Sequence, residues 1–201
     1  GVDGEPVNLS DETTLRLSSA SVRRCFDDLR DKLRKGVPVR ALVYGRRRRG
    51  KSSIIRSLAE DKEINKNFLV HRCVWNGPRM TSLATGFNEL SNALAGALSQ
   101  AGIDLQVLSF DDLMRAEDIS ARFMHWLSEA CRGAKTTLRV LLLVDEFQKW
   151  LVGLGSVQER QALLGAFRHF NERALGHVQV SFVLCGLRNL RNLVNESLDL
   201  V

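Results

Sequence analysis

The stretch "YGRRRRGKSS", residues 44–53, holds the pattern that decides the fold. Gly45, Gly50, Lys51 and Ser52 match the phosphate-loop motif G-x-x-x-x-G-K-[ST] without a mismatch. In this motif the glycines let backbone N–H groups approach phosphate oxygens closely, and the N-terminus of the following helix adds its positive end. Lys51 is therefore predicted to reach the β- and γ-phosphates, and Ser52 to bind magnesium.

The same stretch also allows a second interpretation, a basic patch, because four arginines follow one another: Arg46, Arg47, Arg48 and Arg49. The neighbouring sequence favours the phosphate loop, since an apolar run precedes it at 39–45 and a helical pattern follows at 51–60. Four side chains cannot all face one nucleotide. We expect some to project outward as a solvated rim, or to contact acids, a neighbouring subunit or DNA phosphates.

The rest of the chain alternates between strand and helix patterns. Apolar residues recur at helical spacing in four further segments: 22–33, 83–98, 123–130 and 163–170. Short apolar runs of the kind found in buried strands occur at 39–45, 68–75, 139–146 and 178–186. Such alternation predicts an α/β domain with a mainly parallel sheet.

The composition bounds the class of protein. The chain has 201 residues, of which 44% are hydrophobic and 26% charged, which favours one globular domain. We expect a core domain over 16–201 and a disordered or vector-derived start over 1–15. No apolar run could span a bilayer and no signal peptide is recognisable, so a cytoplasmic protein without a membrane partner is expected. The net charge of +6 favours an anionic partner, but nucleotides and DNA are both anions.

The four cysteines are far apart and include no C-x-x-C pair, which favours free buried thiols over disulfides or zinc: Cys25, Cys73, Cys131 and Cys185.

Two acids close the apolar run at 139–146 and supply the second half of a nucleotide site. Asp145 is predicted to hold magnesium through water. Glu146 is placed to polarise an attacking water, which favours hydrolysis over transfer to a small acceptor. A solvated strand end is the alternative for such a pair, but the phosphate loop makes the catalytic interpretation stronger.

A third element follows the run at 178–186. In ATPases with an extra strand between the phosphate-loop strand and the magnesium-acid strand, that strand ends in a polar sensor of the γ-phosphate. Arg188 or Asn189 could have this role, and Arg188 is our candidate catalytic residue. An ordinary exposed arginine at a helix start is the alternative.

Three stretches resemble STAND-type and related archaeal-type ATPases of the AAA-like branch: "YGRRRRGKSSII", "LLLVDEFQKW" and "VSFVLCGLRNLRNL". The resemblance implies a three-layer P-loop NTPase fold that uses ATP and Mg²⁺. Arg47 and Arg48 fall on the arginine pair of those phosphate loops, and Ser53 on their serine. Arg46 stands where those loops usually have proline. The whole loop, from Gly45 to Ser53, is thus a candidate nucleotide-binding segment.

The resemblance also implies a fifth core strand and a helical lid after the sensor strand. The chain reaches Val201 before either, so we expect a domain that is incomplete at its C-terminus and lacks its lid. The strand at 39–45 would then have an open edge, which is a pairing hazard. We expect the segment 1–15, a partner chain or a crystal neighbour to cover it.

Two classes of function follow from these observations. The first is an ATPase whose nucleotide state switches assembly in signalling or defence, with self-association or a protein partner. The second is a DNA-handling ATPase of transposition or replication initiation, which the helix pattern after 146 also resembles. A degraded ATPase that serves only as a nucleotide-gated scaffold is a third, lesser reading.

Overall fold

A five-stranded sheet lies between two layers of helices in the computed structural model, which describes residues 13–16, 22–46, 50–73, 80–172 and 175–198. The strand order is β1-β2-β5-β4-β3, and all four pairings between these strands are parallel. The strands are β1 (Thr13–Arg16), β2 (Arg40–Tyr44), β3 (Leu69–Cys73), β4 (Leu138–Val144) and β5 (Val178–Gly186). The described helices are α1 (Val22–Arg34), α2 (Lys51–Ala59), α3 (Lys62–Asn67), α4 (Leu83–Ser99), α5 (Phe110–Met114), α6 (Ile119–Arg132), α7 (Gln148–Gly153), α8 (Val157–Glu172) and α9 (Asn189–Leu198). The predicted α/β fold with a parallel sheet is confirmed.

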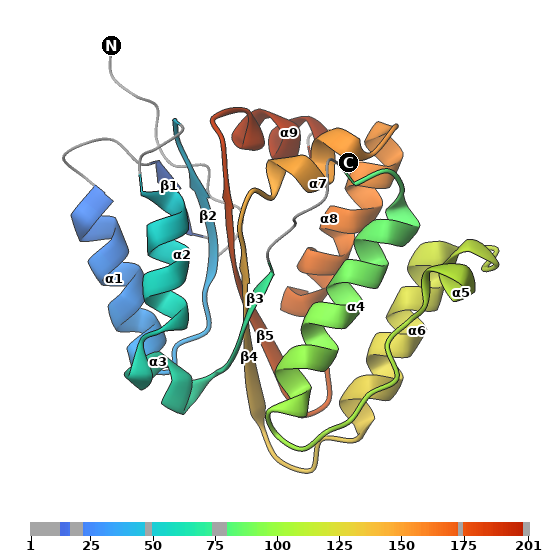
Figure 1. The fold of residues 1–201 in the computed structure, drawn as a ribbon, viewed down its shortest axis with the longest axis horizontal. Coiled ribbons are helices and arrows are strands. Elements are labelled where there is room, and N and C mark those ends of the chain that lie inside the picture. Colours follow the sequence, from blue (N-terminus) through green and yellow to red (C-terminus); the bar gives the residue numbers. More distant parts are fainter. Residues whose placement is uncertain (1–12, 17–21, 47–49, 74–79, 173–174, 199–201) are drawn as a thin grey trace.

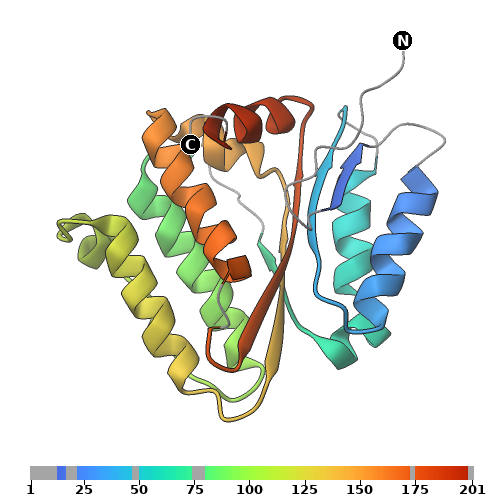
Figure 2. The same ribbon diagram turned by 180° about the vertical axis from the view of Figure 1, so that it is seen from behind.

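The sheet is buried on both faces, which explains the unbroken apolar runs of its central strands. Helices α1, α2 and α3 cover one face, and α4, α6 and α8 lie on the other (Figures 1 and 2). Along β4, Val140, Leu142 and Val144 pack into the larger core beneath α4 and α8. Leu141 and Leu143 point the opposite way, into the smaller core beneath α1 and α2. Because successive side chains alternate across a strand, a run that is apolar at every position requires two cores.

The position of β5 decides where the functional residues meet. It lies between β2 and β4, with Tyr44 opposite Gly186 and Val144 opposite Leu184. This confirms the predicted extra strand between the phosphate-loop strand and the strand that ends in two acids. Since parallel strands end at the same edge, the segments that follow β2, β4 and β5 are brought together there.

The outer edge of β2 is covered by β1, with Thr13 opposite Ala41 and Arg16 opposite Tyr44. This confirms that the N-terminal segment shields the strand at 39–45. It also corrects the boundary drawn at residue 16, because Thr13–Arg16 already belong to the sheet. Four residues of mixed polarity carry too little periodicity to be recognised as a strand before their pairing is known. Residues 1–12 lie outside the described part of the chain.

Three cysteines are free and buried, as predicted: Cys73, Cys131 and Cys185. Burial raises the pKa of Cys131 to about 11 and that of Cys73 to about 12, and raises the pKa of Cys185 further. These thiols are therefore neutral at physiological pH. The side chain of Cys25 lies outside the described residues. No described helix combines the length and the apolar character needed to cross a bilayer.

Gly153, at the end of α7, packs closely against the backbone of another segment. A Cβ built there would overlap the carbonyl group of Met80, a fully buried residue. We expect Gly153→Ala to lower the free energy of unfolding by about 3 kcal/mol, because the backbone itself must move. Urea denaturation measures the change. Gly165→Ala, in the middle of α8 where a Cβ meets nothing, should instead stabilise by about 0.5–1 kcal/mol. Equal stabilities for the two variants would contradict this packing argument.

Candidate functional site

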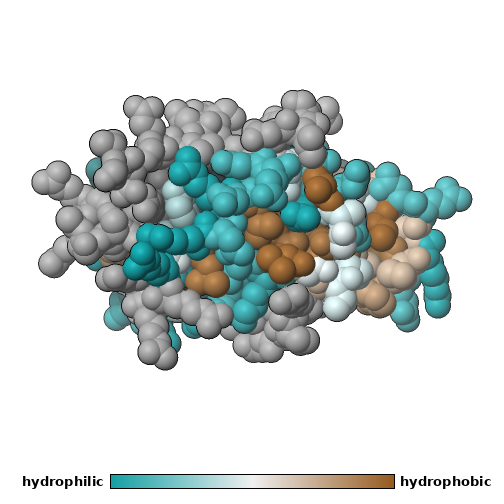
Figure 3. Space-filling view, turned by 90° about the horizontal axis from the view of Figure 1, so that it is seen from above, coloured by the Kyte–Doolittle hydropathy of each residue, from teal (hydrophilic) through white to brown (hydrophobic). Residues whose placement is uncertain are grey.

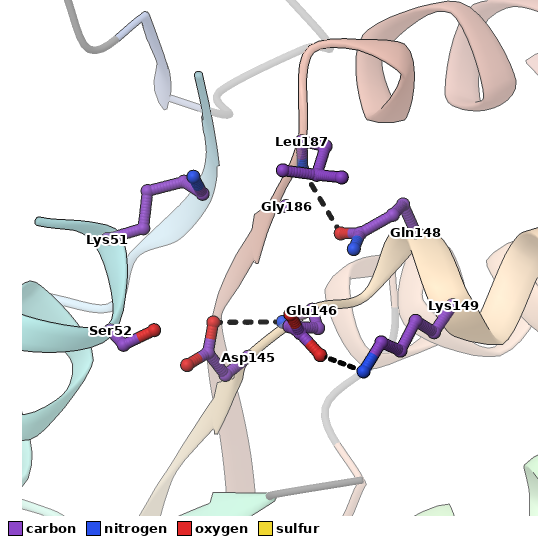
Figure 4. Close-up of a pocket in the computed structure, with 8 residues that line it drawn as sticks. All are labelled: Lys51, Ser52, Asp145, Glu146, Gln148, Lys149, Gly186 and Leu187. Atoms are coloured by element: carbon purple, nitrogen blue, oxygen red, sulfur yellow. Dashed lines mark hydrogen bonds and ion pairs between the residues drawn. The ribbon is translucent and has the colours of Figure 1, made fainter. Parts of the chain in front are cut away.

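A pocket of about 340 Å³ opens at the carboxyl edge of the sheet, a volume within the usual range for small-molecule sites. Its lining comes from α2, from the residues after β4, and from the end of β5 (Figure 4): Lys51, Ser52, Asp145, Glu146, Gln148, Lys149, Gly186 and Leu187. The four predicted residues of the two motifs are thus brought together. Figure 3 looks down on this edge of the molecule, where hydrophilic residues surround separate apolar patches.

The turn into α2 is made by Gly50, whose φ of 83° lies in the left-handed region that favours glycine. Its carbonyl accepts the N–H of Ile54 at 2.9 Å, which begins the helix. Gly50 at the N-cap offers no side chain to the first N–H groups of α2, and no hydrogen bond from another described side chain caps them, so a bound anion could accept from them. At the other end of the loop, Gly45 is buried and its N–H donates to the carbonyl of Gly186 at 3.2 Å.

Lys51 folds back over the loop that precedes it. Its Nζ donates to the carbonyl of Arg46 at 2.8 Å and to that of Gly45 at 3.3 Å. Burial lowers the pKa of Lys51, an effect that the nearby negative charges of Asp145 and Glu146 partly offset. The ammonium group is therefore incompletely compensated, and a phosphate in the loop would supply the missing negative charge.

The side chains of Ser52 and Asp145 point toward each other on one side of the pocket (Figure 4). Asp145 is only 9% exposed, and its Oδ1 accepts the N–H of Glu146 at 2.9 Å. A carboxylate and a hydroxyl are hard oxygen ligands, which fit Mg²⁺ when phosphate and water complete its octahedron. No group of three or more His, Cys, Asp and Glu side chains in the described chain could hold a metal ion by itself.

Glu146 is the one non-glycine residue of the described chain with a positive φ, at 51°. The left-handed conformation costs about 1–2 kcal/mol for such a residue, and strain of this kind clusters at functional sites. The resulting turn separates the side chains of Asp145 and Glu146. The Glu146 carboxylate forms an ion pair with Lys149, one turn further along. Phe147 holds the turn in place, since its N–H donates to the carbonyl of Cys185 at 2.7 Å.

The structure places Arg188 outside this pocket. Its side chain lines a separate depression with Tyr44, Arg191 and Asn192. The backbone explains the placement, because the N–H of Leu187 is bound to Gln148 and the chain then turns directly into α9.

The other predicted residues divide into three groups. Arg46 and Ser53 are exposed and do not line the pocket. Asn189, the alternative sensor, is exposed at the start of α9. Arg47, Arg48 and Arg49 lie outside the described residues.

Sequence reasoning missed four lining residues: Gln148, Lys149, Gly186 and Leu187. One signal was available for Gln148, an amide that stands between Phe147 and Trp150, two residues after Glu146. Both aromatic side chains are in the core, and a polar residue buried among them requires a partner.

Comparisons with known proteins agree with this geometry. A family model described as an AAA domain matches residues 40–194. The solved structure of the Aeropyrum pernix ORC2 protein, in its ADP form, is similar in fold, with a TM-score of 0.55 and 16% sequence identity. The match covers 94% of this chain and 46% of the ORC2 chain, so the present chain spans less than half of that protein's length. No curated protein sequence matches the chain significantly. Because the family match extends from β2 to α9 and so includes the whole pocket, the chain belongs to the AAA domain family of P-loop ATPases.

Proposed function

We propose that this AAA-type domain binds Mg·ATP in the pocket at the carboxyl edge of the sheet and hydrolyses it. One observation carries the proposal: Lys51 and Ser52 of the phosphate loop lie in the same pocket as Asp145 and Glu146. These side chains come from segments about ninety residues apart, and together they supply a phosphate-binding cation, two magnesium ligands and a carboxylate base.

Each side chain has a distinct role in this proposal. Lys51 binds the β- and γ-phosphates, and Ser52 and Asp145 hold the magnesium ion. The ion, when bound, neutralises charge that develops on the phosphate oxygens. Glu146 accepts a proton from the attacking water, for which it must leave Lys149. Since an exposed ion pair contributes only about 0–1 kcal/mol, this rearrangement is inexpensive.

Nucleotide state is proposed to switch the assembly of a larger complex. The arrangement of Lys51 supports a switch, because phosphate binding would draw its Nζ from the carbonyls of Gly45 and Arg46. Of the described lining residues only Lys51 and Lys149 are cationic, and both are already engaged. A further positive charge for the transition state would have to come from the arginine run or from a partner molecule.

Sedimentation velocity tests the switch directly. We expect a larger assembly with the non-hydrolysable analogue Mg·AMP-PNP than with Mg·ADP, without added DNA. A sedimentation coefficient that is the same in both nucleotide states would contradict the assembly role.

The DNA-handling alternative is supported by the net charge of +6 and by exposed Arg46 on the loop rim. Fluorescence anisotropy with labelled duplex DNA distinguishes it. If the protein contacts six or more phosphates, its affinity for DNA should fall roughly 10³-fold or more when salt is raised from 50 to 200 mM. Single-turnover hydrolysis separates both functions from a nucleotide-gated scaffold, which would bind ATP without cleaving it.

A further inference from the structure

Gln148 is a polar side chain that is almost completely buried, yet it forms part of the pocket wall. It is 5% exposed and begins α7, three residues after Asp145. Burial of a carboxamide is unfavourable unless its polar atoms are hydrogen-bonded, so a buried glutamine at the mouth of a site requires an explanation.

One half of the amide has a clear partner. The N–H of Leu187 donates to Gln148 Oε1 at 3.1 Å, where β5 ends. Only an acceptor can face an N–H group, so this contact determines the orientation of the amide and leaves Nε2 on the opposite branch. Figure 4 shows Nε2 on the side of the pocket that holds Glu146.

The absence of a side chain at Gly186 provides room for this arrangement. A Cβ on Gly186 would lie 2.6 Å from Gln148 Oε1 and 2.6 Å from Leu190 Cδ2. Gly186 is not among the residues with positive φ, so its glycine is required for space and not for backbone conformation. The carbonyl of Gly186 also accepts the N–H of Gly45. Gln148 is thus attached to the strand end that touches the phosphate loop.

Different sides of the pocket carry different chemical groups. Lys51 and Ser52 belong to the loop wall, and Asp145 lies beside Ser52 on the metal side. Gln148 lies across from Lys51, next to the proposed base Glu146. Lys51 and Gln148 thus lie on opposite sides of the space in which a terminal phosphate held by Lys51 would bind.

We propose that Gln148 distinguishes a nucleoside triphosphate from a diphosphate, with Nε2 donating to the γ-phosphate while Oε1 holds the end of β5 through Leu187. The inference rests on the proposed nucleotide site and adds a specificity-determining residue to it. A hydrogen bond from a neutral donor to a charged oxygen corresponds to a roughly 10- to 100-fold difference in affinity.

Gln148→Glu is the sharpest test, because the carboxylate still accepts the N–H of Leu187 but replaces the donor with a negative oxygen. Calorimetry with Mg·AMP-PNP and Mg·ADP gives an affinity ratio for each variant. We expect affinity for Mg·AMP-PNP to fall roughly 10- to 100-fold or more, and affinity for Mg·ADP to change less than about threefold. Gln179→Glu, the same substitution at an exposed position near the far end of β5, should leave both affinities unchanged.

The outcomes separate the inference from the function on which it rests. If wild type binds Mg·ADP and Lys51→Ala does not, while Gln148→Glu alters both nucleotides equally or neither, the role of Gln148 is wrong and the site stands. If wild type binds neither nucleotide, both proposals are wrong. If circular dichroism shows that Gln148→Glu is unfolded, the ratio of affinities for Mg·AMP-PNP and Mg·ADP is measured for Gln148→Met instead. This substitution removes the donor without adding charge.

Discussion

Replacing Lys51 by alanine is expected to weaken binding of Mg·ADP and Mg·AMP-PNP by about 2–5 kcal/mol, which is roughly 30-fold or more. The ammonium group is half-buried in the loop, where it donates to the carbonyls of Gly45 and Arg46. Truncation removes the cation that would face the phosphates, and no other described lining residue on the loop side carries positive charge. Isothermal titration calorimetry measures both affinities.

The lowered pKa of Lys51 allows a test of whether Lys51→Ala loses affinity because it no longer folds. Because burial disfavours the charged form, the unfolded chain binds more protons between the folded pKa of Lys51 and its ordinary value of 10.5. Stability of nucleotide-free wild type should therefore rise with pH in that alkaline window. Lys51→Ala lacks this contribution and, at neutral pH, should be at least as stable as wild type. Thermal denaturation of both proteins, at neutral pH and in the alkaline window, tests this.

Lys66→Ala is the matched control, since it removes the same charge from an exposed position on α3. This helix lies at the opposite end of α2 from the phosphate loop (Figure 1). Unchanged affinity in Lys66→Ala is expected, and equal affinities in Lys51→Ala and wild type would contradict the assignment of the loop.

The phosphate loop and the acid pair were predictable because each motif lies within about ten consecutive residues. Gly50 and Lys51 require only a strand before them and a helix after them, and β2 and α2 supply both. The acids after β4 were predictable for the same reason, since an apolar strand followed by Asp145 and Glu146 needs no distant information. The meeting of the two halves follows from parallel strands that end at a common edge.

The environment of Arg188 could not be predicted, because it depends on a contact from another element. The bond between Leu187 and Gln148 links residues 39 positions apart, and it determines how the chain leaves β5.

Short elements were missed for a related reason. Helix α3 contains one buried apolar residue, Ile64, so it shows no periodicity, and it is begun by Asp61, whose side chain accepts two N–H groups.

Glu146→Gln is expected to lower kcat about 10²- to 10⁴-fold while nucleotide affinity changes little. The substitution keeps the size of the side chain and its place beside Asp145, but a carboxamide cannot accept the proton of an attacking water. The ion pair with Lys149 is lost as well, at a cost of only about 0–1 kcal/mol for an exposed pair. Phosphate release under single-turnover conditions, with calorimetry for affinity, separates the two effects.

Glu129→Gln on α6 is the matched control for this experiment. Glu129 also forms an i,i+3 ion pair, with Arg132, and its side chain is 47% exposed against 49% for Glu146. A change in kcat or affinity that both variants share reflects the loss of a surface ion pair. Only the additional decrease in kcat of Glu146→Gln reflects a role in hydrolysis.

Slow hydrolysis is expected even in wild type, because a partner that completes the transition-state charge would be required for full activity. The rate comparison is therefore made in the assembled state, if Mg·AMP-PNP produces one. If Glu146→Gln then hydrolyses ATP as fast as wild type, the base is another residue. The left-handed turn at Glu146 would in that case serve to direct Asp145 toward Ser52 and to begin α7, since the N–H of Glu146 binds Asp145.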